Sequence, residues 1–268
     1  MRQGPALLLL VVACGKPPPE AKHFGERFYS GAAASHVQCS KGVDRAHEWP
    51  HAELAASLEH ARAHGLVLHT YGHAPTLDGV GLSPAGSAAE GPRGSIDLAE
   101  YLADFDWAAA HGVKMVTFRD LAAGFHGAGW AFTVDDDDVD AWFAWREPLR
   151  AHGVKVTFFV TNFAKLTPAQ RQELHVLATD GHDIEAHGAT HQNAVDYSAT
   201  HGLAAYVRDE ALPSQALLAA DGFPAPVAFS YPYGAHTHEL DAALAPHFAW
   251  LRTTGAQWCL KDGDGSAR

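Results

Sequence analysis

The stretch Ala131-Phe132-Thr133-Val134-Asp135-Asp136-Asp137-Asp138 is an apolar, partly β-branched run that ends in four consecutive carboxylates. A parallel strand that ends in acidic residues places negative charge at the mouth of a sheet or barrel, where a functional site can form. Four adjacent carboxylates repel one another, and a divalent cation or a shared proton offsets that repulsion. The alternative is a solvated acidic turn or the first turn of a helix, where Asp is favoured. This stretch alone leaves both interpretations open.

A second stretch, His187-Gly188-Ala189-Thr190-His191, follows a short strand pattern and places two imidazoles four residues apart. Side chains at i and i+4 lie on one side of a helical turn, as in other histidine pairs that bind zinc. Two neutral imidazoles and one carboxylate make a three-ligand site with an open position for water. Because the chain contains 19 His in 268 residues, a chance pair is the alternative.

A third stretch, Phe229-Ser230-Tyr231-Pro232-Tyr233-Gly234, also follows a strand pattern. Taken in this order, the three stretches resemble the polysaccharide deacetylase family, also called the NodB-homology or carbohydrate esterase family 4 group. Thr133 to Asp137 is similar to its Thr-Phe-Asp-Asp-Gly motif, the histidine pair to its His-x-x-x-His motif, and the third stretch to its Arg-x-Pro-Tyr motif. The resemblance extends from about Leu66 to Thr254, over most of the chain.

The resemblance implies a set of roles at the site. Asp136, His187 and His191 would bind a divalent metal, zinc in the first place, with Co²⁺, Ni²⁺ or Fe²⁺ as alternatives. Asp135 would act as the general base, and the backbone N–H of Tyr233 would help to hold the oxyanion. The implied reaction removes N-acetyl groups from an amino-sugar polymer or oligomer and releases acetate.

Three residues beside these motifs are expected to contact the N-acetylated glycan, namely Tyr231, Pro232 and Trp130. The aromatic rings of Trp130 and Tyr231 could stack on sugar rings. Trp142 is more typical of a helix face that packs into the core.

The position of the general acid resembles one subgroup of the family. The strand Leu66 to Tyr71 leads to His73, ahead of the acidic stretch, and no His follows His247. This order resembles the circularly permuted deacetylases, a subgroup that includes lipoprotein enzymes acting on the biofilm polymer poly-N-acetylglucosamine. A closed barrel tolerates permutation because its first and last strands are neighbours. We therefore expect His73 to serve as general acid, and we expect its rival His69, at mid-strand, to be a core residue.

Three features depart from the family pattern. Ser230 stands where many members have the Arg that orients the base, and Asp137 stands where they have Gly. No clear equivalent of the Asp that orients the acidic His is present, although Asp262 and Asp264 in the Gly-rich tail are candidates.

Composition limits the partners. Apolar residues make up 47% of the chain, which is typical of a globular protein, and the net charge is −12. An acidic protein is a poor ligand for phosphate backbones, so no nucleic-acid partner is expected. The same charge favours a neutral glycan over a strongly anionic one. The oligomeric state is not defined by the sequence.

The first residues resemble a bacterial lipoprotein signal. Arg2 precedes a short apolar core from Ala6 to Ala13, too short to span a bilayer, and Cys14 would be the lipidated residue. The alternative is an ordinary secretory signal. Gly15 after the Cys resembles lipoproteins sorted to the outer membrane, so we expect an exported protein anchored to a membrane by lipid, in the outer membrane or periplasm of a Gram-negative host.

Two further cysteines, Cys39 and Cys259, would then lie in an oxidising compartment. An even pair in that compartment is a disulfide candidate, and two free thiols are the alternative.

Strand and helix patterns alternate through the rest of the chain, which predicts parallel strands with crossover helices. We therefore predict an α/β fold, a distorted parallel (β/α)7 barrel of the NodB-homology type in circularly permuted form. The predicted organisation is a signal segment at 1–14, a tether and loop-rich lead-in at 15–48, and a barrel domain at 49–268.

Two other functions stay open at this point. The protein could be a non-catalytic glycan-binding surface lipoprotein on a deacetylase scaffold, or a hydrolase of another amide. Retention of Asp135 argues against the first, because binding alone requires no general base.

Overall fold

The structure is a computed structural model that describes residues 25–31, 36–44, 50–77 and 95–254. The predicted signal segment with Cys14, most of the tether, Cys259, Asp262 and Asp264 lie outside the described residues. The lipidation site and the disulfide therefore stay predictions. In the described part of the chain, no helix has the length and apolar character that crossing a bilayer requires.

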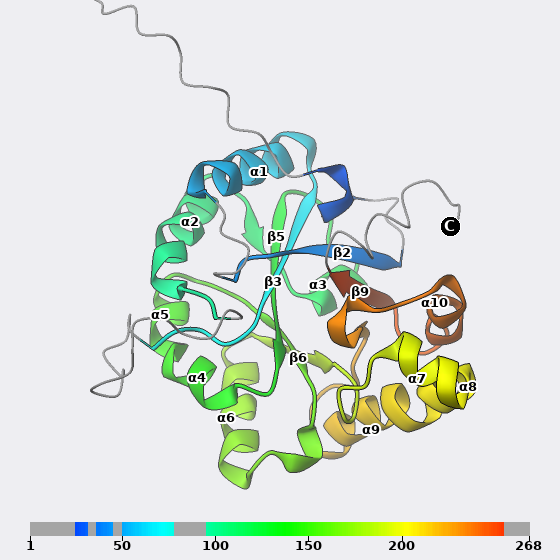
Figure 1. The fold of residues 1–268 in the computed structure, drawn as a ribbon. Helices are drawn as coiled ribbons and strands as arrows, with labels where there is room; N and C mark the ends of the chain where they lie inside the picture. Colours follow the sequence, from blue (N-terminus) through cyan, green and yellow to red (C-terminus); the bar gives the residue numbers. More distant parts are fainter. Residues whose placement is uncertain (1–24, 32–35, 45–49, 78–94, 255–268) are drawn as a thin grey trace, which may run out of the picture.

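The centre of the fold is a closed parallel barrel (Figure 1). Among the described residues, seven parallel strands follow one another around it, and β3 closes the ring by pairing with both β2 and β5. In order around the barrel they are β3 (Val67–Gly72), β2 (Val37–Gly42), β9 (Trp250–Thr254), β8 (Ala228–Ser230), β7 (Asp183–Ala186), β6 (Thr157–Val160) and β5 (Gly129–Asp136). This is the predicted (β/α)7 barrel.

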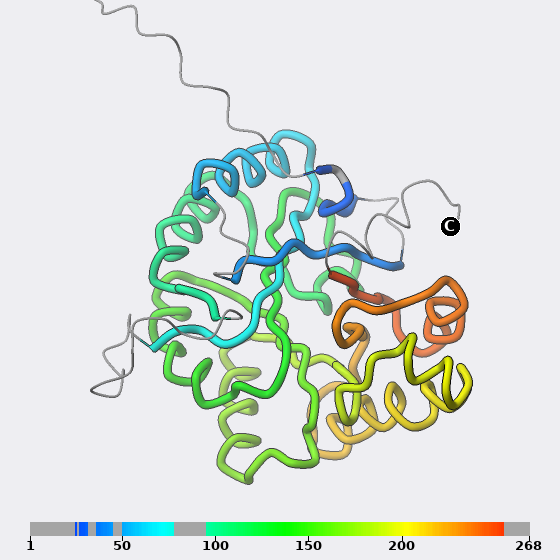
Figure 2. The backbone as a smooth tube through the Cα atoms, in the orientation of Figure 1, coloured from blue at the N-terminus to red at the C-terminus, as the bar shows by residue number. Residues whose placement is uncertain are grey.

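Two short strands extend the sheet. β1 (Tyr29–Ser30) pairs antiparallel with the beginning of β3, and β4 (Lys114–Met115) pairs parallel with the beginning of β5. Figure 2 shows the blue N-terminal tube beside the red C-terminal tube, where β2 and β9 pair over four residues. The ends of the described chain therefore meet in the barrel wall, as expected for a permuted barrel.

The strand β2 was missed from the sequence. It lies inside the segment that we predicted as a loop-rich lead-in ending at residue 48, so the barrel begins earlier than expected. The run Val37-Gln38-Cys39-Ser40-Lys41-Gly42 contains few large apolar side chains, yet the structure buries most of it. Burial in the barrel wall overrides the weak strand pattern, because sheet preference depends on context.

Helices surround the barrel (Figure 1). Their bounds are α1 (His51–His64), α2 (Leu98–Ala110), α3 (Phe118–Ala122), α4 (Val139–Ala144), α5 (Arg146–Ala151), α6 (Pro168–Thr179), α7 (Ala194–His201), α8 (Leu203–Tyr206), α9 (Leu212–Ala220) and α10 (His238–Leu244). Short 3-10 turns lie at Glu26–Phe28, Phe163–Lys165 and Pro232–Gly234, and a π turn lies at Val207–Ala211.

Local signals explain several helix boundaries. A capping box opens α6: the hydroxyl of Thr167 accepts the Gln170 N–H at 3.2 Å, and the Gln170 side chain accepts the Thr167 N–H at 3.0 Å. Gly65 ends α1 in the left-handed conformation, at φ 63°. A second capping box, at Thr117 and Asp120, begins α3.

The core lies between the outer face of the barrel and the helices. Trp130, Phe132 and Val134 project from β5 into this layer, and each is at most 1% exposed. Trp142 on α4 packs there too, with its ring 5.6 Å from that of Phe158. Trp142 is therefore a core residue, as its helix face indicated.

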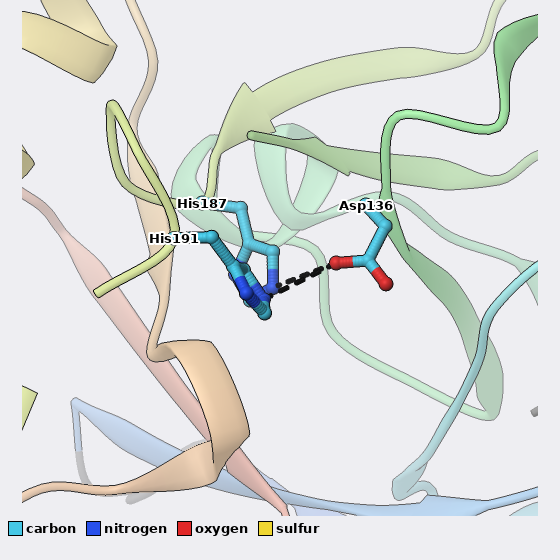
Figure 3. A group of neighbouring side chains, drawn as sticks. All are labelled: Asp136, His187 and His191. Atoms are coloured by element: carbon cyan, nitrogen blue, oxygen red, sulfur yellow. Dashed lines mark ion pairs between the residues drawn. The ribbon is translucent and has the colours of Figure 1, made fainter. Parts of the chain in front are cut away.

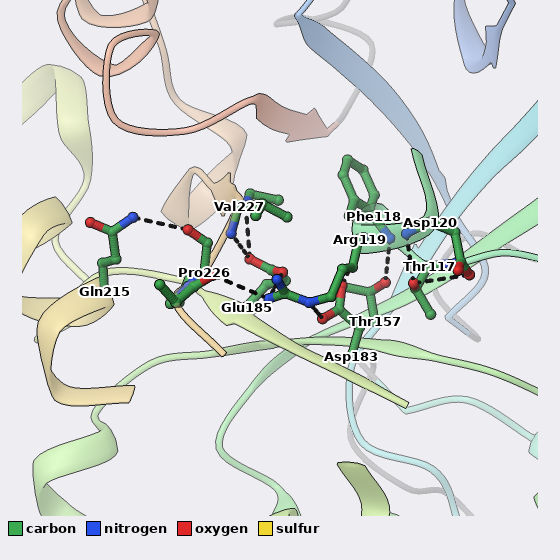
Figure 4. A network of polar contacts seen from close by, with 12 residues as sticks. Thr117, Phe118, Arg119, Asp120, Thr157, Asp183, Glu185, Gln215, Pro226 and Val227 are labelled. Carbon is green, nitrogen blue, oxygen red and sulfur yellow. Dashed lines mark hydrogen bonds and ion pairs between the residues drawn. The ribbon is translucent and has the colours of Figure 1, made fainter. Parts of the chain in front are cut away.

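At the amino ends of the strands, α3 closes the barrel with a buried polar network (Figure 4). Arg119 pairs with Asp183 at 3.0 Å and with Glu185 at 2.8 Å. Glu185 also accepts the backbone N–H groups of Val227 and Ala228, at 2.7 and 2.8 Å. Each buried carboxylate thus has partners, and the network joins α3, β7 and β8 at the end of the barrel opposite the acidic strand end.

Candidate metal-dependent active site

The acidic strand ends in a backbone turn that brings two neighbouring carboxylates together. Adjacent side chains on a strand normally point to opposite faces. Asp136 instead adopts a positive φ of 79°, which breaks that alternation at the end of β5. Such a conformation costs about 1–3 kcal/mol for a residue with a side chain and is typical of functional sites. As a result, Asp135 and Asp136 both lie within 4 Å of the His187 ring.

Asp136, His187 and His191 form a possible three-residue metal site (Figure 3). The two imidazole rings lie side by side and face the Asp136 carboxylate, at the carboxyl ends of β5 and β7. Nε2 of His191 lies 3.2 Å and Nε2 of His187 lies 3.7 Å from Oδ1 of Asp136. One ligand atom from each residue lies within 4.8 Å of the other two. These are the three residues that the sequence indicated.

Two of the three donor groups have the protonation state that a divalent cation requires. Burial lowers the pKa of His187, although the charges of Asp135 and Asp136 partly oppose this, so the imidazole is neutral. Its Nδ1 lies 2.9 Å from the carbonyl of Ser230 and donates to it, which leaves Nε2 free to bind a metal. The Ser230 main chain thus orients one ligand, although its side chain replaces the family's Arg.

The carboxylate is ionised as well. Burial raises the pKa of Asp136, but its hydrogen bond with His191 and its Coulombic interactions with the surrounding histidines outweigh burial and bring the pKa to about 2. Two imidazoles and an ionised carboxylate fit zinc and similar transition metals.

Asp135 is paired with an arginine that comes from a different strand than the family motif implies. Nη2 of Arg252, on β9, donates to Oδ1 of Asp135. Arg252 is fully buried, and its guanidinium also lies over the rings of Tyr71 and Phe159, at 5.2 and 5.0 Å. The guanidinium therefore reaches Asp135 from β9. Arg252 is the register partner of Ser230, which lies on the neighbouring strand β8.

His73 is oriented by a carboxylate that the sequence analysis did not identify. Nδ1 of His73 lies 2.8 Å from Oδ2 of Asp44, and the His73 backbone N–H donates to Oδ1 of the same carboxylate at 2.9 Å. Asp44 lies directly after β2 and is 2% exposed. Burial lowers the pKa of His73, but the hydrogen bond to Asp44 and the charges of Asp135, Asp44 and Asp136 outweigh it and raise the pKa to about 9.

The rival histidine lies in the core, as expected. His69 is fully buried, and its Nε2 lies 2.7 Å from the hydroxyl of Ser30. Burial, with the charge of Arg252, lowers the pKa of His69 to about 3. A neutral ring with no access to solvent is poorly suited to protonate a leaving group. We therefore retain His73 as the candidate general acid.

We expect Asp44→Asn to lower the pKa of His73 in the metal-free protein, from about 9 toward the ordinary value of 6.5. The substitution removes the negative charge and the acceptor that favour the imidazolium. Because an acid must be protonated to act, the alkaline limb of the activity profile should move to lower pH. Titration of the His73 ring by NMR measures the shift directly. An unchanged His73 pKa in Asp44→Asn would exclude the pairing, and Asp106→Asn, which removes an exposed partner of His152, is the control.

Tyr233, in the third motif, lies beside the candidate metal site. Tyr233 is exposed, at 62%, and its ring lies 4.7 Å from that of His191. Its φ of 61° turns the chain beside the metal site. The use of its backbone N–H as an oxyanion donor stays a prediction.

The expected substrate contacts of Trp130, Tyr231 and Pro232 are wrong for the side chains. Trp130 is fully buried and donates its indole N–H to Thr70 Oγ1 at 2.9 Å. Tyr231 is also fully buried, with its hydroxyl on Asp241 at 2.8 Å, and Pro232 is buried in its turn. The apolar face of the strand explains the error, because a large aromatic there packs into the core instead of facing a sugar.

Two residues of the candidate site were therefore missed, and only Arg252 left a signal in the sequence. Arg252 is a lone cation within the apolar strand pattern from Phe248 to Thr253, which is unusual for a buried strand. Asp44 follows β2, the strand that was not recognised.

Comparison with known proteins agrees with this geometry. The polysaccharide deacetylase family profile matches residues 124–247, a little under half of the chain. This segment contains Asp135, Asp136, both metal-site histidines and Tyr233, and it leaves out Asp44, His73 and Arg252. The match confirms the resemblance to this family and supports a deacetylase activity. The comparison with curated proteins found no significant match.

Solved structures share the fold at low identity. IcaB from Ammonifex degensii is 18% identical with a TM-score of 0.51, covering 69% of this chain and 84% of that one. A de-N-acetylase from Aggregatibacter actinomycetemcomitans is 16% identical with a TM-score of 0.52 and the same two coverages, 69% and 84%. A polysaccharide deacetylase from Bacillus cereus is 14% identical with a TM-score of 0.54, covering 70% and 57%. These likenesses establish the NodB-type barrel.

Proposed function

We propose that the protein is a metal-dependent hydrolase that removes N-acetyl groups from a neutral amino-sugar polymer or oligomer and releases acetate. The observation that carries the proposal is the convergence of three elements at the carboxyl ends of the strands. These are the Asp136, His187 and His191 group, the Asp135–Arg252 pair and the Asp44–His73 pair. In a parallel barrel, this end is where chemistry takes place.

The chain's own residues divide the work of amide hydrolysis. Asp135, ion-paired with Arg252, takes a proton from the attacking water. His73, held by Asp44, gives a proton to the amine nitrogen as the C–N bond breaks. A divalent cation held by Asp136, His187 and His191 would polarise the acetamide carbonyl and lower the pKa of water. The products are acetate and a free amino group.

Zinc is the metal that we propose, because two imidazoles and one carboxylate with an open position are typical of catalytic zinc sites. The net charge of −12 favours a neutral N-acetylglucosamine chain over a polyanion. The same neutral polymer is the substrate class that the permuted order of His73 and the acidic strand suggests.

Acetate release from a substrate panel tests this function. N-acetylglucosamine oligomers, a peptidoglycan fragment and a small acetamide would each be incubated with zinc-loaded protein and with protein treated with a chelator. We expect acetate from the oligomers, and loss of that activity with the chelator. Tight binding of oligomers without acetate release would instead favour a non-catalytic glycan-binding protein, and release from the small amide alone would favour another amide substrate.

We also propose that export and lipidation at Cys14 place the enzyme at a membrane surface. In cells, Cys14→Ser is expected to move the protein from the membrane fraction to the soluble fraction, because it removes the thiol that would carry the lipid. Fractionation followed by immunoblotting measures this, and an unchanged membrane fraction would contradict the anchor.

A further inference from the structure

The loop between the two histidines of the metal site has an unusual backbone. Gly188 has a φ of 80° and His191 a φ of 63°. The second value costs about 1–3 kcal/mol in a residue with a side chain, so the surrounding structure must hold it. The loop is therefore not a helical turn, and the i and i+4 spacing does not by itself explain how the two rings meet.

Glu210 holds this loop through three hydrogen bonds. Its backbone carbonyl accepts the Ala189 N–H at 3.0 Å. Its Oε2 accepts the Thr190 N–H at 2.9 Å, and its Oε1 accepts the Thr190 hydroxyl. Glu210 is 3% exposed, so these contacts are shielded from water. Hydrogen bonds are stronger in the protein interior than in water. Glu210 therefore binds both residues between Gly188 and His191: its backbone binds Ala189, and its side chain binds Thr190.

Gly188, at the beginning of the loop, is closely surrounded by Glu210 and other residues. A Cβ atom at Gly188 would lie 3.2 Å from Glu210 Oε2 and 3.4 Å from Pro232 Cγ. On the other side, the Thr161 hydroxyl donates to the Gly188 carbonyl at 3.0 Å. Glycine at this position fits both the positive φ and the nearby carboxylate.

A π turn carries Glu210. The segment Val207–Ala211 lies between α8 and α9, and the Leu212 N–H bonds to the Val207 carbonyl, five residues earlier. Pro213 follows and has no N–H to continue a regular helix. Single π turns of this kind are frequent at functional sites.

We propose that Glu210 is a positioning residue for the metal site, which acts through Ala189 and Thr190 to hold His191 in its ligating conformation. The inference rests on the proposed metal site. Glu210 is not itself a ligand, since both of its carboxylate oxygens are bound by Thr190 and it lies outside the three-residue group. Because the loop is already held in this conformation, metal binding does not incur the free-energy cost of ordering it.

Zinc affinity of Glu210 variants, measured by competition with a chelating dye, tests the proposal. Glu210→Ala should weaken zinc binding about 10- to 100-fold, the range found when residues that orient metal ligands are changed. Glu210→Gln should bind nearly as the parent does, because its amide can still accept the Thr190 N–H and donate to the Thr190 hydroxyl. This variant separates positioning from simple attraction of the cation by a negative charge.

The matched control is Asp209→Ala. Asp209 is the neighbouring carboxylate of the same π turn, and it pairs with Arg208 and with the Tyr197 hydroxyl instead of the loop. Its loss should leave zinc affinity close to that of the parent. If Glu210→Ala does not fold, Thr190→Val carries the test, since it removes the hydroxyl contact and should weaken zinc binding in the same direction.

Hydrogen exchange of the metal-free protein provides a second readout that does not depend on the proposed function. The Ala189 and Thr190 amides should exchange faster in Glu210→Ala than in the parent or in Asp209→Ala. A parent that binds no zinc would contradict the proposed function, while fast exchange confined to Glu210→Ala would still support the loop contact. Parent-like zinc affinity and parent-like exchange in Glu210→Ala would overturn the inference.

Discussion

Replacing His187 by alanine is expected to remove both the bound metal and acetate release. His187 supplies one of three donor atoms, and the two that remain, from Asp136 and His191, cannot complete a catalytic metal site. Loss of Lewis-acid chemistry removes several kcal/mol of transition-state stabilisation. Since each factor of ten in rate corresponds to about 1.4 kcal/mol, activity should fall about a thousandfold or more. Metal content by mass spectrometry and acetate release measure the two effects on one sample.

The control for this variant must also remove a buried imidazole. His182 lies just before β7, at the end of that strand opposite to His187; it is 6% exposed and accepts the Val156 N–H at 3.0 Å. His182→Ala should lower thermal stability and yet retain a full complement of metal. Full metal occupancy in His187→Ala would refute the assignment of the site.

Asp135→Asn should retain the metal and lose most of the activity. The amide cannot take a proton from water, and removal of a general base lowers rates about 10²- to 10⁴-fold. The substitution also deprives the buried Arg252 of its carboxylate, and breaking a buried ion pair costs about 3–5 kcal/mol. Stability should therefore fall too, so rates must be measured on protein shown to be folded by circular dichroism.

Asp140→Asn is the matched control for the base. Asp140 belongs to the same acidic region but is exposed on α4, where it accepts the Gln170 side-chain N–H at 3.1 Å. Its activity and stability should be close to those of the parent. An Asp135→Asn protein that releases acetate at the parent rate would exclude Asp135 as the base.

The metal site could be predicted from the sequence because its residues lie in short, local patterns. Asp135 and Asp136 end an apolar strand, and His187 and His191 follow another, so parallel strands bring them to one end of a barrel. The order of His73 ahead of the acidic strand was enough to predict a permuted barrel. What the pattern did not reveal is the backbone: positive φ at Asp136 and His191 arises from tertiary contacts.

The partners of the proposed base and acid, Asp135 and His73, could not be predicted in the same way. Asp44 lies 29 positions before His73, and Arg252 lies 117 positions after Asp135. The Asp44–His73 pair depends on β2 lying beside β3. The Asp135–Arg252 pair joins two strands that are not neighbours, because β3 and β2 lie between β5 and β9 in the closed barrel. Arg252 on β9 supplies the guanidinium that the family motif places at position 230. A short sequence motif cannot reveal this change, because Arg252 lies outside the motif.

The wrong prediction for Trp130 and Tyr231 has a related cause. Aromatic residues next to a site motif are compatible with both sugar stacking and core packing, and the choice depends on which face of the strand each side chain occupies. The structure buries both rings, and it is Tyr233 that exposes an aromatic side chain beside His191.

The central claim is that acetate release depends on one metal held by Asp136, His187 and His191. The most direct measurement is a titration of metal-free protein with zinc, in which acetate release from N-acetylglucosamine oligomers is followed at each addition. The account predicts no release without metal, a linear rise, and a plateau when one zinc is bound per chain. Acetate release at the full rate from protein that contains no metal, or no release at full zinc occupancy, would contradict it.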